Sequence, residues 1–407
     1  MPGVGRTGVK LVFPGLVVAV LVASLIAAPL LGVSASASDR TIKVLNYSEY
    51  IDYEVLRIFE DRYGIKVVYD EYESAEEAWP YLKAGGGGYD VIIIAHSHVK
   101  LAIEQGLVRK LDKTLIPNLA NLDPRIASHP ADPSQDYAVP YMWGTTGIAY
   151  VKGCVTEPPR AWKEFLTKSF MERYSGKVSL LSEFSEVVEA GMIALGIDPS
   201  DRSSWTKENI DKVVELIVGL KPYLAGFYGA SQYIPGLVNG ELCLAQAWNG
   251  DALIAADENP EVGYVAPEDG TLFWVDYMVI PRDAHDVEAA HLFINFLLEP
   301  EIAAMNLKAV WYAPSIKKSL LEPLARSDPE LREVLDNPLV YPPSNTKLIP
   351  SPVLDSEMQS LVEDARSRIL ASQPSNLDST LVIVVGVVVL VVAAAFLYRL
   401  SRGASRS

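Results

Sequence analysis

The sequence predicts an α/β protein built from two lobes. The chain has 407 residues, which at about 150 residues per domain corresponds to two or three domain-sized units. Segments typical of strands and helices alternate from residue 41 onward, and a second alternating series occupies residues 160–266. Repeated strand–helix–strand units favour a parallel sheet covered on both faces, whose binding sites lie beyond the carboxyl ends of the strands.

The first series begins with an extended apolar segment at 41–46. Helical spacing of apolar residues then predicts a helix over 53–63, which Gly64 should end. The elements expected after it are a strand at 65–69, a helix at 75–84 interrupted near Pro80, a buried strand at 90–95 and a helix at about 97–105.

The second series follows an apolar stretch at 145–151. Its pattern predicts helices near 161–172, 184–195, 207–220 and 250–257. A strand at 273–280 and a strongly apolar helix at 287–298 come after it. No repeat of the first lobe is visible in the second.

Both ends of the chain carry uncharged apolar runs. Residues 11–31 follow two basic residues and precede Ala35-Ser-Ala37, as in a cleaved export signal, although an uncleaved transmembrane helix is an alternative. Residues 381–398 are long enough to span a bilayer, and three arginines follow them. The alternative is a buried core helix. This pattern predicts an exported body, anchored to the outer face of the cell membrane by a C-terminal helix.

These features divide the chain into seven predicted parts. They are a signal peptide (1–38), the first segment of lobe 1 (39–144), lobe 2 (145–268), a return segment of lobe 1 with C-terminal helices (269–370), a stalk (371–380), a transmembrane anchor (381–398) and a cytoplasmic tail (399–407).

Acidic side chains dominate the body of the protein. Residues 39–380 contain 30 basic and 51 acidic side chains, a formal charge of −21 that repels nucleic acid and attracts cations. The two cysteines, Cys154 and Cys243, could pair outside the cytoplasm, but apolar surroundings are equally typical of buried free thiols.

Motifs for catalysis or cofactor binding are weak. The run Gly85–Gly88 lacks the Lys-Ser/Thr of a phosphate loop and predicts a flexible turn. The pair His96 and His98 could bind zinc, but Ser97 between them is equally suited to cap a helix. Glu183 and Glu186 could serve a glycosidase, although no matching sugar subsite is evident. We therefore predict no metal, no cofactor and no enzymatic activity.

Aromatic and acidic residues recur together at the predicted ends of elements. Aromatic rings attract ammonium groups and cover methylene chains, and carboxylates accept charge-assisted hydrogen bonds from ammonium groups, so the combination is typical of a polycation pocket. Each residue could instead be structural, a tryptophan in the core or a glutamate near a helix N-terminus. The residues are Tyr47, Tyr50, Glu183, Glu186, Trp248, Trp274 and Asp276.

The sequence resembles the extracytoplasmic spermidine/putrescine-binding proteins of ABC importers over nearly all of residues 41–345. That resemblance implies a type II periplasmic-binding-protein-like fold, in which two lobes joined by crossing strands close on a ligand like a hinged clamp. It also implies ATP hydrolysis in separate subunits. The matching stretches are Tyr47-Ser-Glu-Tyr50, Tyr63-Gly-Ile-Lys-Val67, Gly106-Leu-Val, Leu111-Asp112, Asn121-Leu-Asp-Pro124, Tyr137-Ala-Val-Pro-Tyr-Met-Trp-Gly144, Trp248-Asn-Gly250, Phe273-Trp-Val-Asp276 and Ile294-Asn-Phe-Leu-Leu298.

The resemblance also implies roles for individual residues. The aromatic walls correspond to Tyr47, Tyr50, Trp248, Trp274 and Tyr312, and the ammonium-binding acids to Glu183, Glu186 and Asp276. The chain departs from the family at Tyr47, where a tryptophan is usual, at Glu183, where an aspartate is usual, and at Ser97, which occupies a tyrosine position. A glutamine contact of the family has no counterpart near Val353.

The predicted function is capture of a polyamine by a monomeric binding protein and its delivery to importer permease subunits, with the ATPase subunits as indirect partners. Within the same fold, the alternatives are another small cation, a zwitterionic amine or ferric iron, whose sites often use adjacent tyrosines that this chain lacks. A secreted hydrolase and an adhesin or sensor ectodomain are alternatives from other classes.

Overall fold

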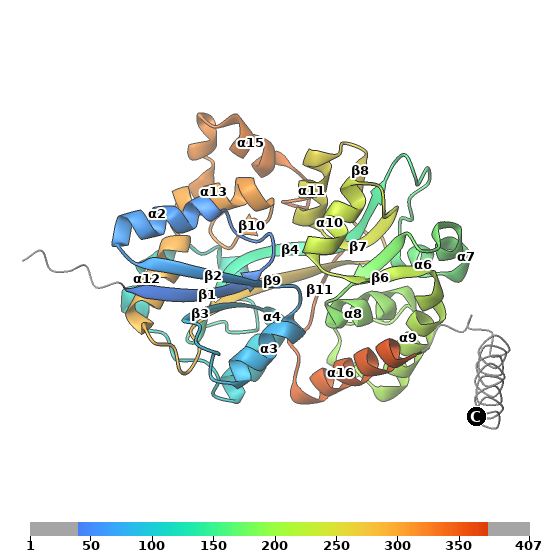
Figure 1. Cartoon of the computed structure of the whole chain (residues 1–407), viewed down its shortest axis with the longest axis horizontal. Coiled ribbons are helices and arrows are strands. Elements are labelled where there is room, and N and C mark those ends of the chain that lie inside the picture. The colour runs from blue at the N-terminus through green and yellow to red at the C-terminus, as the bar shows by residue number, and fades with distance from the viewer. Residues whose placement is uncertain (1–39, 373–407) are drawn as a thin grey trace, which may run out of the picture. The chain divides into compact units, whose positions relative to one another are not determined.

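A single mixed sheet of eleven strands runs through both lobes of the protein. The structure, a computed structural model, describes residues 40–372. Its strands follow the order β2-β1-β3-β9-β4-β7-β5-β6, with β8 and β10 paired to β4 and β11 paired to β9 (Figure 1). The strands are β1 (Thr41–Tyr47), β2 (Lys66–Tyr72), β3 (Val91–Ala95), β4 (Ala138–Val151), β5 (Val178–Leu181), β6 (Leu224–Tyr228), β7 (Leu244–Trp248), β8 (Val262–Val265), β9 (Thr271–Val279), β10 (Ala313–Pro314) and β11 (Leu348–Pro350).

The prediction of a parallel sheet is right for each lobe and wrong for their junction. In the first lobe β1 pairs in parallel with β2 and β3, and in the second β5 pairs in parallel with β6 and β7. Between them, β9 is antiparallel to both β3 and β4, and β4 is antiparallel to β7. The difference arises because β4 carries the chain from the first lobe to the second, whereas β9 carries it back.

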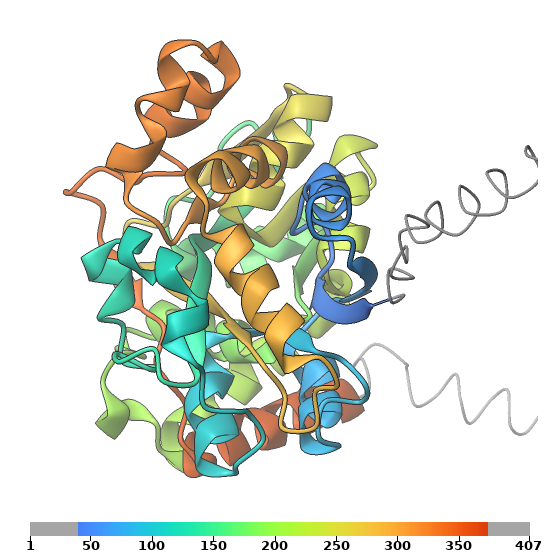
Figure 2. The ribbon, with the colours of Figure 1, turned by 90° about the vertical axis from the view of Figure 1, so that its left-hand side faces the viewer.

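Helices cover both faces of the sheet. In Figure 1, α2, α13, α10 and α11 lie above the sheet, and α3, α4, α8, α9 and α16 lie below it. Figure 2 looks onto the first lobe, where α12 lies beside the short helices η1 (Lys113–Leu115) and η2 (Pro117–Asn121). The α-helices are α2 (Tyr53–Tyr63), α3 (Ala75–Lys83), α4 (His96–Glu104), α5 (Pro124–Ala127), α6 (Trp162–Phe165), α7 (Lys168–Met171), α8 (Phe184–Ala194), α9 (Lys207–Leu220), α10 (Ala230–Val238), α11 (Asn249–Glu258), α12 (Val287–Leu297), α13 (Pro300–Val310), α14 (Lys318–Leu321), α15 (Pro329–Asp336) and α16 (Ser356–Ala371).

Most helices predicted from apolar spacing are present, and four details differ. Helix α3 continues through Pro80, where an interruption was predicted. The helix expected at 161–172 is divided into α6 and α7 because Thr167 is extended, with φ −124° and ψ 144°. Helix α4 begins one residue early, so Ala95 occupies the N-cap position and Ser97 lies in the first turn. Helix α10 was not predicted. By contrast, Gly64 ends α2 as expected, in the left-handed conformation with φ 65°.

The last described helix, α16, packs against α8 and α9 of the second lobe, although the sequence assigned residues 269–370 to the first lobe. Its buried residues include Met358, Val362 and Ile369. The segment before α16 also joins the sheet, because β11 pairs with β9. The C-terminal part of the chain therefore contacts both lobes, and the exact lobe boundaries stay a prediction.

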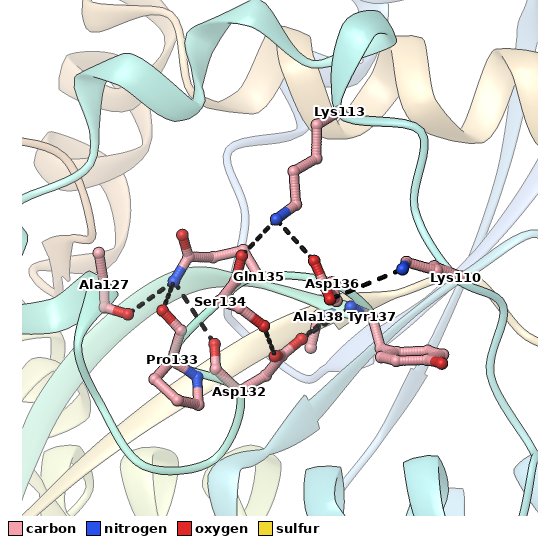
Figure 3. A network of polar contacts seen from close by, with 10 residues as sticks. All are labelled: Lys110, Lys113, Ala127, Asp132, Pro133, Ser134, Gln135, Asp136, Tyr137 and Ala138. Carbon is pink, nitrogen blue, oxygen red and sulfur yellow. Dashed lines mark hydrogen bonds and ion pairs between the residues drawn. The ribbon is translucent and has the colours of Figure 1, made fainter.

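A buried carboxylate holds the loop that leads into the crossing strand β4. Asp132 accepts hydrogen bonds from the backbone N–H groups of Tyr137, at 2.7 Å, and Ala138, at 3.0 Å. Its other oxygen accepts from the Ser134 hydroxyl at 3.2 Å (Figure 3). Because Ala138 is the first residue of β4, Asp132 fixes where that strand begins.

Replacing Asp132 with alanine should therefore lower the free energy of unfolding by about 2–4 kcal/mol, since two backbone donors would lose their acceptor. Urea denaturation of the full chain measures this change. The matched control is Asp136→Ala, which removes a half-exposed carboxylate that pairs with Lys113 and should lower stability much less, because water screens this ion pair. Equal losses in the two variants would show that Asp132 does not anchor the loop.

The two cysteines, which the sequence left undecided, form a disulfide. Cys154 and Cys243 are bonded, and their Cα atoms are 5.6 Å apart. Cys154 lies in an exposed turn after β4, unlike the buried free thiol considered for it, whereas Cys243 is buried directly before β7. The bond ties the end of the crossing strand to the core of the second lobe.

The run Gly85–Gly88 forms a turn, as predicted, and all four glycines have positive φ. A Cβ at Gly85 would lie 2.0 Å from a carboxylate oxygen of Asp283, so this position needs glycine for space as well. Within residues 40–372 no helix is both long and apolar enough to cross a bilayer. The predicted signal (1–38) and anchor (381–398) lie outside the described residues.

Candidate functional site

All nine residues predicted to bind ligand lie on the wall of one cavity. The empty space between these residues measures about 480 Å³, a figure that includes space open to solvent. Six further residues line it that the sequence did not assign. The predicted residues are Tyr47, Tyr50, Ser97, Glu183, Glu186, Trp248, Trp274, Asp276 and Tyr312, and the others are Ser48, Ala95, His96, Ser185, Glu189 and Asp251.

The carboxyl ends of parallel strands bring these residues together. Tyr47 ends β1, Ala95 ends β3 and Trp248 ends β7. Glu183 follows β5 by two residues. Because the ends of strands from both lobes converge here, residues far apart in sequence meet at one site, as expected for an α/β sheet. The crossing strand β9 adds Trp274 and Asp276 from the junction between the lobes.

The aromatic side chains form a continuous wall that includes both lobes. The ring centroids of Tyr47, from the first lobe, and Trp248, from the second, are 5.9 Å apart. Tyr312 continues the wall, with its ring 4.9 Å from that of Tyr50 and 5.5 Å from that of Trp274. Such rings cover methylene groups and attract ammonium groups to their faces.

Glu186 orients the two tryptophans of the wall. One of its carboxylate oxygens accepts a hydrogen bond from the indole N–H of Trp248 at 2.9 Å, and the other accepts from the Thr146 hydroxyl. The oxygen of Thr146 in turn accepts from the indole N–H of Trp274 at 3.0 Å. The position of both indoles therefore depends on a single acid.

Asp276 and Asp251 differ in how their oxygens are occupied. The two carboxylate oxygens of Asp251 accept hydrogen bonds from the hydroxyls of Tyr233 and Tyr312. Asp276 instead lies beside the hydroxyl of Tyr50, which is buried without a hydrogen-bond partner of normal geometry. Asp276 is thus the acid of the wall with the greatest capacity to accept from a ligand.

The cavity concentrates negative charge without a basic side chain to balance it. Five carboxylates line it, and no lysine or arginine of the described chain does. Burial raises the pKa of Glu186 and of Asp251 to about 7, and raises the pKa of Asp276 and Glu189 well above their usual range. Each shift means that ionised acids are unstable here until a cation enters.

This electrostatic imbalance predicts that stability depends on pH. The pKa of Glu186 rises from 4.5 to about 7 on folding, so its neutral form stabilises the fold below pH 4.5, by up to about 3 kcal/mol, and this contribution is lost as pH rises through 7. A bound cation offsets the loss because it stabilises the ionised acids. We expect an aliphatic diammonium cation to raise the melting temperature more at about pH 8 than at about pH 5, as measured by calorimetry. An equal increase at both pH values would contradict the prediction, and Glu186→Gln should reduce the difference.

The two histidines considered as a possible zinc pair contact different neighbours. His96 lines the cavity, and its ring is 5.4 Å from that of His129. The ring of His98 packs against Trp79. Burial lowers the pKa of all three histidines, which keeps them neutral. Within the described part of the chain, no group of three or more His, Cys, Asp or Glu side chains could hold a metal ion.

Comparison with known proteins identifies the family to which this chain belongs. The model of the bacterial extracellular solute-binding proteins matches residues 54–333. The chain belongs to this family. The putrescine-binding periplasmic protein of Escherichia coli K12 is 33% identical over 343 residues, which cover 79% of this chain and 90% of the relative. The spermidine/putrescine-binding periplasmic protein of the same organism is 32% identical, over 78% of this chain and 88% of the relative.

Solved structures share the two-lobed fold. An ABC transporter protein from Listeria monocytogenes superposes with a TM-score of 0.74 at 27% identity, over 82% of this chain and 100% of that one. The spermidine/putrescine substrate-binding protein of Streptococcus pneumoniae superposes with a TM-score of 0.64 at 25% identity, over 81% of this chain and 98% of that one. The resemblance inferred from the sequence motifs is thereby confirmed.

The predicted location needs correction. The sequence predicted a protein anchored to the outer face of the cell membrane by a C-terminal helix, whereas the relatives are periplasmic proteins by name. The apolar run at 381–398, on which that prediction depended, lies outside the described residues, and the described part contains no membrane-spanning helix.

Proposed function

We propose that this protein captures a polyamine of the spermidine/putrescine class and delivers it to the membrane subunits of an ABC importer. The observation that carries the proposal is an aromatic-walled cavity with five buried carboxylates and, among the described residues, no basic side chain on its wall. A cation with several ammonium groups separated by methylenes complements this wall in charge and in polarity. The relatives named for putrescine and spermidine binding support the same ligand class.

The lining residues then have distinct roles. Asp276 accepts hydrogen bonds from one ammonium group of the ligand, and the rings of Tyr47, Trp248 and Trp274 cover the methylene chain. Glu186 holds the two indoles and contributes negative charge. The crossing strands β4 and β9 join the lobes that close around the ligand.

Titration calorimetry of the full-length protein tests the ligand class. Putrescine and spermidine should bind saturably, whereas butanediol, which has the putrescine chain without its charges, should not bind. γ-Aminobutyrate should bind far more weakly than putrescine, because the cavity wall offers no lysine or arginine to its carboxylate. Stronger binding of γ-aminobutyrate would instead favour a receptor for zwitterionic amines. Transport is tested separately, since cells that lack this protein should take up less labelled putrescine.

A further inference from the structure

Two helices from different lobes meet end to end beside the cavity, and neither has a capping hydrogen bond from its N-cap side chain. Helix α3 of the first lobe has Ser74 at its N-cap, and α8 of the second lobe has Glu183 there. Neither side chain forms a capping hydrogen bond within its own helix. The first backbone N–H groups of a helix need an acceptor, particularly where the end is buried.

Each helix receives its cap from the opposite lobe. One carboxylate oxygen of Glu183 accepts a hydrogen bond from the backbone N–H of Ala75, the first residue of α3, at 2.8 Å. In return, a carboxylate oxygen of Glu76, in the first turn of α3, accepts from the backbone N–H of Phe184, the first residue of α8, at 3.3 Å. The second oxygen of Glu183 accepts from the Ser185 hydroxyl at 2.9 Å.

Glu73, which precedes the N-cap residue of α3, extends the contact between the lobes to a third helix. Glu73 accepts a hydrogen bond from the backbone N–H of Ser231, near the start of α10 in the second lobe, at 3.4 Å. The N-cap position of α10 is Gly229, which has no side chain to cap the helix. A Cβ at Gly229 would lie 2.0 Å from a carboxylate oxygen of Glu73 and 2.7 Å from its Cβ. The approach of the lobes at this point therefore requires glycine.

We propose that Glu76 and Glu183 form a reciprocal cap that holds the two lobes together in the closed state. Both act as positioning residues, because their hydrogen bonds exist only while the lobes are in contact. Glu183 therefore stabilises the closed lobes and does not bind the ligand, since both of its carboxylate oxygens already accept hydrogen bonds from the protein. The inference rests on the proposed function in one respect, that closure encloses a ligand.

A ligand that binds only the closed state gains affinity from anything that stabilises that state, whatever its own length. Loss of one cap should weaken binding of putrescine and spermidine by the same factor, about two-fold to thirty-fold, mainly through faster dissociation. A lost ammonium contact would instead change the ratio between the two ligands.

Alanine and glutamine variants distinguish the cap from a ligand contact. Glu183→Ala and Glu76→Ala should both weaken binding by similar factors. Glu183→Gln should restore most of the affinity, because the amide oxygen of glutamine can still accept from Ala75. If Glu183→Gln were as harmful as Glu183→Ala, and the losses differed between putrescine and spermidine, Glu183 would be a ligand residue and the proposal would be wrong.

Gly229→Ala tests closure without touching the cavity wall. The added methyl group should collide with Glu73 only when the lobes close. The affinity for putrescine and for spermidine should therefore fall by about five-fold to one hundred-fold. The matched control is Gly219→Ala in α9, where a Cβ meets nothing within 4 Å. Unchanged affinity in Gly229→Ala, or the same loss in the control, would overturn the proposal.

A measurement without ligand separates failure of the cap from failure of the proposed function. Dyes placed at the exposed positions Lys100 and Lys207, one on each lobe, report the distance between the lobes by single-molecule energy transfer. We expect the full-length protein to visit a closed state that Glu76→Ala, which removes one half of the cap, and Gly229→Ala both deplete. Identical distance distributions would overturn the cap. If this depletion is seen but neither putrescine nor spermidine binds, the cap stands and the polyamine assignment fails.

Discussion

Replacing Asp276 with asparagine should weaken putrescine binding by about thirty-fold to several thousand-fold. The substitution preserves the shape of the side chain and removes the charge proposed to hold an ammonium group. Removing one member of a buried, hydrogen-bonded charge pair costs about 2–5 kcal/mol, and each 1.4 kcal/mol corresponds to a factor of ten in affinity. Titration calorimetry of the full chain measures the loss, and Asp276→Asn should remain folded because burial already favours the neutral form of this acid.

Two further variants provide reference values for the loss of affinity in Asp276→Asn. Asp61→Asn makes the same chemical change on α2, where 74% of the aspartate side chain is exposed, and should leave binding unchanged. Trp274→Phe keeps an aromatic face and should cost less than Asp276→Asn, because a cation–π contact contributes about 0.5–2 kcal/mol. A loss in Asp276→Asn no larger than that in Asp61→Asn would show that Asp276 does not hold a cation.

Removing the disulfide should have the largest effect on stability. The bond between Cys154 and Cys243 closes a loop with a sequence separation of 89 residues. Closing a loop of that length in the unfolded chain stabilises the native state by about 4 kcal/mol. The double variant Cys154→Ala/Cys243→Ala should therefore unfold at a distinctly lower urea concentration than the wild type.

A reducing agent provides the control for this prediction. Because Cys154 is exposed, reduction should lower the stability of the wild-type protein to nearly that of the double variant, and should leave the double variant unchanged. Ligand affinity should be retained wherever the protein is still folded, since neither cysteine lines the cavity. Equal urea midpoints for wild type and double variant would show that the bond does not stabilise the fold.

The sequence also contains signals for two cavity residues that were not predicted. Glu189 follows Glu186 by three residues on α8, the same spacing that separates Glu183 from Glu186, so the three acids recur along one side of the helix. Asp251 directly follows the stretch Trp248-Asn-Gly250 in the first turn of α11. Both line the cavity, and neither was predicted.

The α/β character of each lobe followed from the sequence alone, and so did seven of the nine predicted residues on the cavity wall. This was possible because apolar periodicity is a local property, and because parallel strands deliver the residues at their carboxyl ends to a common edge. Tyr47 and Trp248 end β1 and β7, so a prediction of these strands also placed two residues of the site. Trp274 and Asp276 instead lie within the antiparallel strand β9. The other two predicted residues, Ser97 and Tyr312, were implied only by the resemblance to the family.

Three features became visible only in the folded protein: the antiparallel junction of β4 and β9, the pairing of the cysteines and the hydrogen-bond partners of each acid. Glu183 shows why. In the sequence, a glutamate beside a helix start looks the same whether its carboxylate binds an ammonium group or caps a helix. In the structure, its carboxylate accepts a hydrogen bond from the backbone N–H of Ala75, 108 residues away in the chain. Contacts between segments so distant leave no local pattern in the sequence, because they depend on how the two lobes approach each other in space.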